Sequence, residues 1–131
     1  MQVFVRRSTD NGVTWTERLG ISPTNGVIAV FPQVAGGEAG RFSIAWADNR
    51  YGARRFNTWV SDSFDSGDTW SKEARVSNLG HGAGYKHPAG YQFSYGDYFD
   101  IDITNTQKAF LAWGEGFGYF AGGGTWFNVQ A

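Results

Sequence analysis

The sequence predicts an all-β chain built from repeated units of short antiparallel strands. Three features of the 131 residues indicate this class: aromatic residues make up 18% of the chain, nineteen glycines interrupt short runs rich in β-branched and aromatic residues, and one turn sequence occurs twice. No stretch has the apolar spacing of an amphipathic helix. The length suits one domain that can bury a core.

The repeated turn spans residues 8–15 and residues 63–70, which lie 55 positions apart. The first copy reads Ser-Thr-Asp-Asn-Gly-Val-Thr-Trp, and the second reads Ser-Phe-Asp-Ser-Gly-Asp-Thr-Trp. The identical positions hold Ser8 and Ser63, Asp10 and Asp65, Gly12 and Gly67, Thr14 and Thr69, and Trp15 and Trp70. Five identities at fixed places within eight residues indicate a duplicated structural unit.

A second repeat is independent of the first. Residues 44–48, Ile-Ala-Trp-Ala-Asp, resemble residues 111–115, Leu-Ala-Trp-Gly-Glu, at an offset of 67. Residues 58–60, Thr-Trp-Val, resemble residues 125–127, Thr-Trp-Phe, at the same offset. Because separate segments share one offset, a whole unit is duplicated, with a longer insertion in the later copy.

These repeats predict nine strands in three units. The first, half unit covers 1–22, with strands expected near 2–7 and 16–21. The complete unit covers 23–78, with strands near 30–35, 41–47, 57–62 and 71–77. The three-stranded unit covers 79–131, with strands near 97–104, 108–114 and 125–130. Four short antiparallel strands in each unit are typical of a β-propeller blade. The sequence therefore predicts a single partial β-propeller domain of two to three blades. Its strands follow the order C-D, A-B-C-D, A-B-C, where A is innermost and D outermost.

The repeated turn has a local structural explanation. We expect the carboxylate of Asp10 or Asp65 to accept hydrogen bonds from backbone N–H groups two residues on, and the following glycine to adopt a positive φ. The Ser and Thr hydroxyls satisfy further turn amides, and the Trp packs against a neighbouring sheet. Calcium is the alternative, but neither copy has the ligand spacing of a calcium loop with a closing Glu. We therefore expect structural turns, no metal and no cofactor.

These turns resemble the Asp-box, the bacterial neuraminidase repeat, of sialidases and related propellers. Residues 46–50, 95–98 and 113–116, with Thr125-Trp126, resemble elements of the carboxy-terminal portion of such secreted proteins. The resemblance implies a sialidase-like propeller fragment related to secreted glycoside hydrolases, inactive or weakly active alone, and extracellular or periplasmic. Sialidases use an arginine triad, a Tyr nucleophile paired with Glu, and an Asp acid/base, and this chain has no counterpart of the Arg-Ile-Pro element that carries the first arginine.

Propeller geometry places the B–C and D–A loops at the end opposite the Asp-box turns, where the candidate site residues would gather. The catalytic candidates are Asp48, Arg50, Tyr98 and Glu115, and the ligand-binding candidates are Asn49, Tyr85, Tyr91, Tyr95 and Asp97. Simpler interpretations remain open. Asp48 and Arg50 could cap a loop as an exposed ion pair, and Tyr95 and Tyr98 could pack at a strand start. In the long loop 80–91, His81 and His87 could be a metal pair or simply exposed.

The amino-acid composition excludes some classes of binding partner. The net charge of −1 gives no electrostatic basis for binding nucleic acid or an anionic membrane, and no apolar run is long enough to span a bilayer. The chain has no cysteine, and its start does not have the order of a signal peptide. The first and last units lack strands, so their open edges predict self-association. The alternatives to a hydrolase fragment are a non-catalytic module that binds a glycan or a protein, and a self-assembling structural unit.

Overall fold

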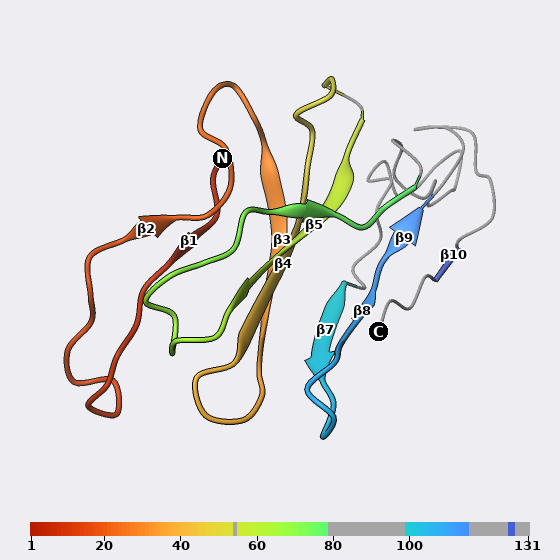
Figure 1. Ribbon diagram of the computed structural model, residues 1–131. Coiled ribbons are helices and arrows are strands. Elements are labelled where there is room, and N and C mark those ends of the chain that lie inside the picture. Colours follow the sequence, from red (N-terminus) through yellow and green to blue (C-terminus); the bar gives the residue numbers. More distant parts are fainter. Residues whose placement is uncertain (54, 79–98, 116–125, 128–131) are drawn as a thin grey trace, which may run out of the picture.

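The computed structural model describes residues 1–53, 55–78, 99–115, 126 and 127, and these residues form antiparallel β-sheets without a helix (Figure 1). The predicted all-β class is therefore confirmed. The strands are β1 (Phe4–Val5), β2 (Leu19–Gly20), β3 (Ala29–Gly36), β4 (Phe42–Asp48), β5 (Asn57–Ser63), β6 (Ala74–Arg75), β7 (Asp100–Ile103), β8 (Ala109–Ala112), β9 (Gly114–Glu115) and β10 (Trp126–Phe127). Within this described part, no helix exists that could cross a membrane.

The largest sheet contains four strands in the order β3-β4-β5-β6, so strands that follow one another in the chain also lie side by side. Its central pair, β4 and β5, runs in register from Phe42 opposite Ser63 to Asp48 opposite Asn57. Strand β3 contains a register shift between Val30 and Gln33. The other described strands form three two-stranded sheets: β1-β2, β7-β8 and β9-β10.

The outer strands are shorter than the sequence predicts. The strand expected over 71–77 reduces to β6, although backbone bonds persist on both sides of it, from Ser71 N to Asp62 O at 2.8 Å and from Val76 N to Thr58 O at 2.9 Å. An outer strand has one neighbour, so a local twist leaves bonded positions without a continuous ladder. The strand expected over 108–114 divides into β8 and β9, so the described residues contain ten strands where the sequence predicts nine.

Both faces of the central sheet are covered by apolar side chains. One core joins Ala35 and Ala45 to residues of the β7-β8 sheet and the segment after it, namely Ile101, Ile103, Leu111 and Trp113. The other core joins Ala29, Ile44, Trp46 and Trp59 to Val3, beside β1. Neighbouring residues along a strand point to opposite faces, which is why Ala45 enters one core and Ile44 and Trp46 the other. The β1-β2 sheet, the central sheet and the β7-β8 sheet therefore stack as three layers.

The two cores repeat each other. Trp46 and Trp113, which lie 67 residues apart, are 0% and 1% exposed. Val5 and Ile21 pack beside the core of Trp46, and the residues 55 positions later, Val60 and Val76, pack beside the core of Trp113. Both sequence offsets thus relate residues with the same packing role.

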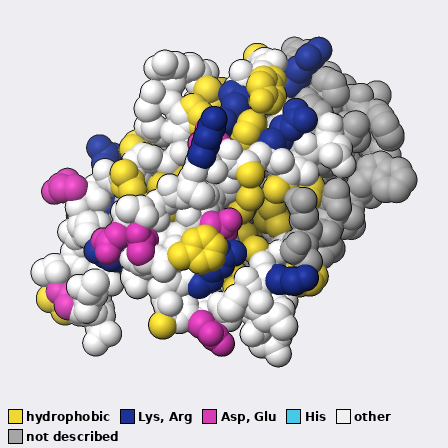
Figure 2. All heavy atoms as spheres, viewed as in Figure 1, with side chains coloured by type: hydrophobic (Ala, Val, Ile, Leu, Met, Phe, Trp, Pro, Cys, Tyr) yellow, Lys and Arg dark blue, Asp and Glu magenta, His cyan; other side chains and the backbone are white. Residues whose placement is uncertain are grey.

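The hairpin turns gather at one end of the stack. Figure 1 shows the β1–β2, β3–β4, β5–β6 and β7–β8 turns at the lower end. The loop 22–28 and residues 49–53 after β4 lie at the upper end. On the face seen in Figure 2, hydrophobic side chains occupy the middle and Lys and Arg side chains lie around them. The two ends therefore offer different sets of residues: the repeated turns below, and Asp48 with its neighbours above.

Candidate functional site

The first repeated turn is closed by its own side chains. The Ser8 hydroxyl donates to Asp10 Oδ1 at 2.8 Å and accepts from the backbone N–H of Gly12 at 2.8 Å. The backbone N–H of Thr14 donates to Asp10 Oδ1 at 2.9 Å, and the Thr14 hydroxyl donates to Asp10 Oδ2 at 2.5 Å. Each contact lies within the eight-residue motif, so the turn needs no ligand to hold its shape.

The second turn repeats the same bonds. Ser63 donates to Asp65 Oδ1 at 2.8 Å and accepts from Gly67 N at 2.8 Å, while Thr69 N donates to Asp65 Oδ1 at 2.9 Å. The Thr69 hydroxyl also donates to the Asp65 carboxylate. Two sequences that differ at three of eight positions therefore build one hydrogen-bond pattern.

The sequence prediction for this turn is partly corrected. Gly12 and Gly67 do adopt positive φ, at 87° and 84°, and the serine hydroxyl does accept from a turn amide. The carboxylate, however, accepts from the amide four residues on, not two. The reason is that the residue before each glycine also has a positive φ, 57° at Asn11 and 61° at Ser66, which curls the chain so that the Thr amide faces the carboxylate.

These bonds keep the turn carboxylates ionised. Hydrogen bonds from the Thr hydroxyl, the Thr amide and the Ser hydroxyl, in that order of size, lower the pKa of Asp10 to about 2 and that of Asp65 to about 2. Among the described residues, no group of three or more His, Cys, Asp or Glu side chains could hold a metal ion.

The two motif tryptophans differ in packing. Trp70 packs against the core of Ile44, Trp46 and Trp59, as the sequence predicts. Trp15 is 54% exposed, and its indole N–H donates to Gly12 O at 3.0 Å within its own turn. The prediction is therefore wrong for Trp15, which lies in neither described core and lines an open groove with Val34 and Phe42.

The second turn also joins the layers at the lower end. Arg7, just beyond β1, forms an ion pair with Asp68 and donates to Ser66 O at 3.2 Å. The Ser66 N–H in turn donates to Gly40 O, in the β3–β4 turn, at 2.9 Å. The 63–70 turn thus connects the first layer to the central sheet, and the 8–15 turn has no equivalent contact from another described segment.

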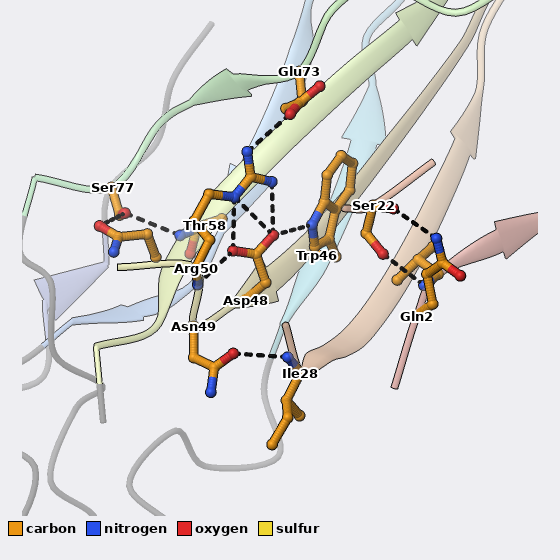
Figure 3. Close-up of polar contacts among 12 residues, drawn as sticks. Gln2, Ser22, Ile28, Trp46, Asp48, Asn49, Arg50, Thr58, Glu73 and Ser77 are labelled. Carbon is orange, nitrogen blue, oxygen red and sulfur yellow. Dashed lines mark hydrogen bonds and ion pairs between the residues drawn. The ribbon is translucent and has the colours of Figure 1, made fainter. Parts of the chain in front are cut away.

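Asp48, at the end of β4, anchors a cluster at the upper end (Figure 3). Its carboxylate is 0% exposed and accepts from the Trp46 indole N–H at 2.8 Å. Arg50 binds it with two nitrogens, Nε to Oδ1 at 2.9 Å and Nη2 to Oδ2 at 2.7 Å. Arg50 Nη1 donates to Glu73 Oε1, just before β6, at 2.8 Å. The guanidinium carbon lies 3.4 Å from the centroid of the Trp59 ring.

This arrangement overturns the interpretation of Asp48 and Arg50 as an exposed ion pair. The side chain of Arg50 is only 15% exposed, and that of Asp48 is fully buried. Burial would lower the pKa of Arg50, but the hydrogen bonds and charges of Asp48, then Glu73, raise it above its usual value. Both charges are thus compensated within the protein. The exposed-pair prediction fails because the wide indoles of Trp46 and Trp59 enclose the pair.

Asn49 is also buried rather than presented to a ligand. It is 8% exposed, and its side-chain oxygen accepts a hydrogen bond from the backbone N–H of Ile28 at 2.7 Å. The backbone N–H of Asn49 donates to Ile28 O at 3.3 Å. These bonds fasten the loop after β4 to the segment before β3. The prediction of Asn49 as a ligand-binding residue therefore gains no support from its position.

The remaining candidates are not brought to this cluster by the described structure. Glu115 ends β9, and nothing is described for its side chain. The other candidates lie outside the described residues: Tyr85, Tyr91, Tyr95, Asp97, Tyr98, His81 and His87.

Several residues of structural importance were missed by sequence reasoning. Glu73 and Trp59 complete the Arg50 cluster, and no repeated position marks Glu73, since its counterpart 55 residues earlier is Arg18. Ser22 and Ser77 could have been recognised from the sequence, because they lie 55 residues apart, like the repeated turns. Their hydroxyls accept from Val3 N at 2.8 Å and from Thr58 N at 2.9 Å. These buried serines repeat one backbone anchor in both units.

Comparison with known proteins adds no identity: no family model, no curated protein and no solved structure matches this chain.

Proposed function

We propose that this chain forms successive blades of an Asp-box β-propeller of the sialidase-like kind, related to secreted glycoside hydrolases. In it the described residues serve as scaffold and carry no hydrolytic centre. The observation that carries the proposal is the state of Arg50, the one arginine of the predicted catalytic set. It is held by two carboxylates and an indole, so it has no free face for a substrate.

The propeller part of the proposal is supported by three repeated features. The central sheet has four antiparallel strands in chain order, as a blade requires. The turns closed by Asp10 and Asp65 have the same hydrogen bonds on successive layers. Finally, the two cores place Trp46 and Trp113 at equivalent buried positions. Face-to-face layers related by a sequence offset are the arrangement that adjacent blades adopt.

The scaffold part of the proposal follows from electrostatics. An arginine that binds a substrate carboxylate must present its planar fork to that carboxylate. In this chain Asp48 already occupies the fork, and the pair lies among tryptophans where breaking it is costly. A substrate would have to displace a buried carboxylate, so Arg50 is suited to fixing the loop after β4 and not to catalysis.

Hydrolysis of a fluorogenic sialoside tests this proposal. We expect residues 1–131 to release no fluorophore above a buffer blank, under conditions in which a known sialidase is active. The Arg50→Ala variant should be equally inactive but less stable, whereas Arg55→Ala, at an exposed arginine, should match the wild type in both respects. Hydrolysis that Arg50→Ala abolishes without lowering the melting temperature would show that Arg50 is catalytic and overturn the proposal.

A further inference from the structure

The chain contains two Asn-Gly dipeptides: Asn11-Gly12 in the first repeated turn, and Asn25-Gly26 in the loop before β3. Glycine has no side chain to shield its amide nitrogen, so in this dipeptide that nitrogen can attack the carbonyl carbon of the asparagine side chain. All four residues are exposed. Since the two dipeptides are identical, a difference in their reactivity must come from the backbone around them.

The first repeated turn holds its dipeptide in a conformation that prevents this attack. Asn11 has a φ of 57° and Gly12 a φ of 87°, and the backbone N–H of Val13 donates to Asp10 O at 3.4 Å. This is the geometry of a type I′ turn, with both central residues in the left-handed region. In that region the next amide nitrogen lies on the opposite side of the Cα–C bond from Cβ. Gly12 N therefore reaches the Asn11 side chain only after a rotation that opens the turn.

Ser8 restrains the same nitrogen a second time. The backbone N–H of Gly12 donates to Ser8 Oγ at 2.8 Å, and the Ser8 hydroxyl is itself fixed by its bond to Asp10 Oδ1 at 2.8 Å. This hydrogen bond must break before the amide can lose its proton and attack, which adds to the barrier. The hydrogen bonds that define the repeated turn thus also protect Asn11.

The Asn25-Gly26 dipeptide has no such restraint. Among the described residues no hydrogen bond holds Gly26 N, and a Cβ added at Gly26 would meet nothing within 4 Å. The side-chain oxygen of Asn25 accepts from the Thr24 hydroxyl at 3.2 Å. A donor on this oxygen stabilises the negative charge that develops there during attack on the carbonyl carbon. The nitrogen is therefore free to rotate, and the carbon that it attacks is open and polarised.

We propose that Asn25 is a site of spontaneous conversion to aspartate and isoaspartate, whereas the repeated turn protects Asn11. The Gly26 amide loses its proton to hydroxide, and its nitrogen forms a bond to Asn25 Cγ. The Cγ–Nδ2 bond breaks, and the nitrogen leaves with the electron pair, takes a proton from water and departs as ammonia. Water then opens the cyclic imide at either carbonyl, which gives aspartate or isoaspartate. The reaction consumes one water, releases one ammonia and involves no oxidation or reduction.

The conversion adds a carboxylate to the upper end of the stack, where the loop 22–28 lies (Figure 1). The isoaspartyl form also lengthens the backbone by one carbon, between the points where Ser22 binds Val3 N and Asn49 binds Ile28 N. The proposal goes beyond the scaffold role and does not depend on it. It would stand even if the hydrolysis assay were positive.

Peptide mapping by mass spectrometry, after incubation of the folded chain in mildly alkaline buffer, tests the proposal. A converted peptide gains the mass difference between an OH and an NH2 group, and its aspartyl and isoaspartyl forms separate on chromatography. We expect Asn25 to convert about tenfold faster than Asn11 or more, because Asn11 must first lose the bonds of its turn. In urea the two rates should become similar. Equal rates in the folded chain, a faster Asn11, or a difference that persists unchanged in urea would overturn the proposal.

A matched pair of variants tests the protection of Asn11. Ser8→Ala removes the acceptor of the Gly12 N–H, so conversion of Asn11 should become about fivefold faster while the rate at Asn25 stays the same. Ser63→Ala is the control, because it removes the equivalent bond from the second repeated turn, which contains no Asn-Gly dipeptide. Equal rates at Asn11 in the two variants would contradict protection by the turn.

Discussion

Arg50 holds the buried carboxylate of Asp48 with two parallel hydrogen bonds, of 2.9 Å from Nε and 2.7 Å from Nη2, while its guanidinium stacks on Trp59. This relationship explains how a charged pair persists inside a sheet layer. The Asp48 carboxylate has a second side-chain partner in Trp46, and Arg50 has a second carboxylate partner in Glu73. The pair fastens the end of β4 to β5 and to the start of β6.

Arg50→Ala should therefore be strongly destabilising. It leaves the Asp48 carboxylate buried with only the indole N–H and a backbone amide as candidate donors, and removing one partner of a buried ion pair costs about 3–5 kcal/mol. Urea unfolding followed by tryptophan fluorescence measures the change. Arg55→Ala should shift the free energy of unfolding by less than about 0.5 kcal/mol, as is usual for exposed positions. A similar small shift for Arg50→Ala would contradict the described cluster.

Gly37→Ala should loosen the contact between the β3–β4 and β7–β8 turns. A Cβ at Gly37 would lie 2.5 Å from Gln107 Oε1 and 2.9 Å from Ile103 Cγ2, so both side chains must shift away from the β3–β4 turn. The shift of Gln107 also breaks the bond from Glu38 N to Gln107 Oε1, at 2.9 Å. We expect a loss of about 1–3 kcal/mol in unfolding free energy. Gly36→Ala, whose Cβ would meet only Phe42 at 3.4 Å, should cost less, and the reverse order would show that the turns do not touch.

The two Asp-box-like turns should respond unequally to the same substitution. Asp10→Asn and Asp65→Asn each remove the charge that organises a turn, so both should lower the melting temperature. Asp65→Asn should lower it more, because its turn also contacts Arg7 in the first layer and Gly40 in the neighbouring turn of its own sheet. Differential scanning fluorimetry measures both, with Asp100→Asn as an exposed control. Equal shifts would mean that these additional contacts contribute no stability.

Acid should weaken the protein through these same carboxylates. Their pKa values fall from 3.8 to about 2 in the folded chain, so the folded state holds fewer protons than the unfolded state between these values. The stability they contribute is complete above pH 3.8 and is lost as the pH falls through about 2. The melting-temperature gap between wild type and an Asp10→Asn/Asp65→Asn variant should therefore narrow from about pH 5 to about pH 2. A constant gap over that range would contradict the assigned pKa shifts.

Local and periodic features of the fold were predictable from the sequence. The repeated Ser, Asp, Gly and Thr define the turns through short-range bonds, so residues 8–15 and 63–70 form as predicted, apart from the amide that the Asp accepts. The shared offsets also gave the strand order of the central sheet, because duplicated sequence implies duplicated pairing.

Features that depend on neighbouring layers were not predictable. Trp15 and Trp70 are the same residue in the same motif, yet only Trp70 packs in a core, because the layer beside it is present. The sequence suggests that Asp48 and Arg50 are exposed polar residues. Strand pairing buries them, because it brings Trp46, Trp59 and Glu73 around them. In both cases the neighbouring layers decide whether a side chain is buried, and the spacing of residues in the sequence does not predict this burial.

The stacking of repeated units is tested most directly by methyl-to-indole nuclear Overhauser effects in a methyl-labelled sample. We predict contacts of Val5 and Ile21 with the core of Trp46, and separate contacts of Val60 and Val76 with the core of Trp113. The two sets must coexist, since each belongs to a different face of the central sheet. Contacts of Val60 with Trp46 in place of Trp113, or the absence of either set, would contradict stacked, equivalent layers.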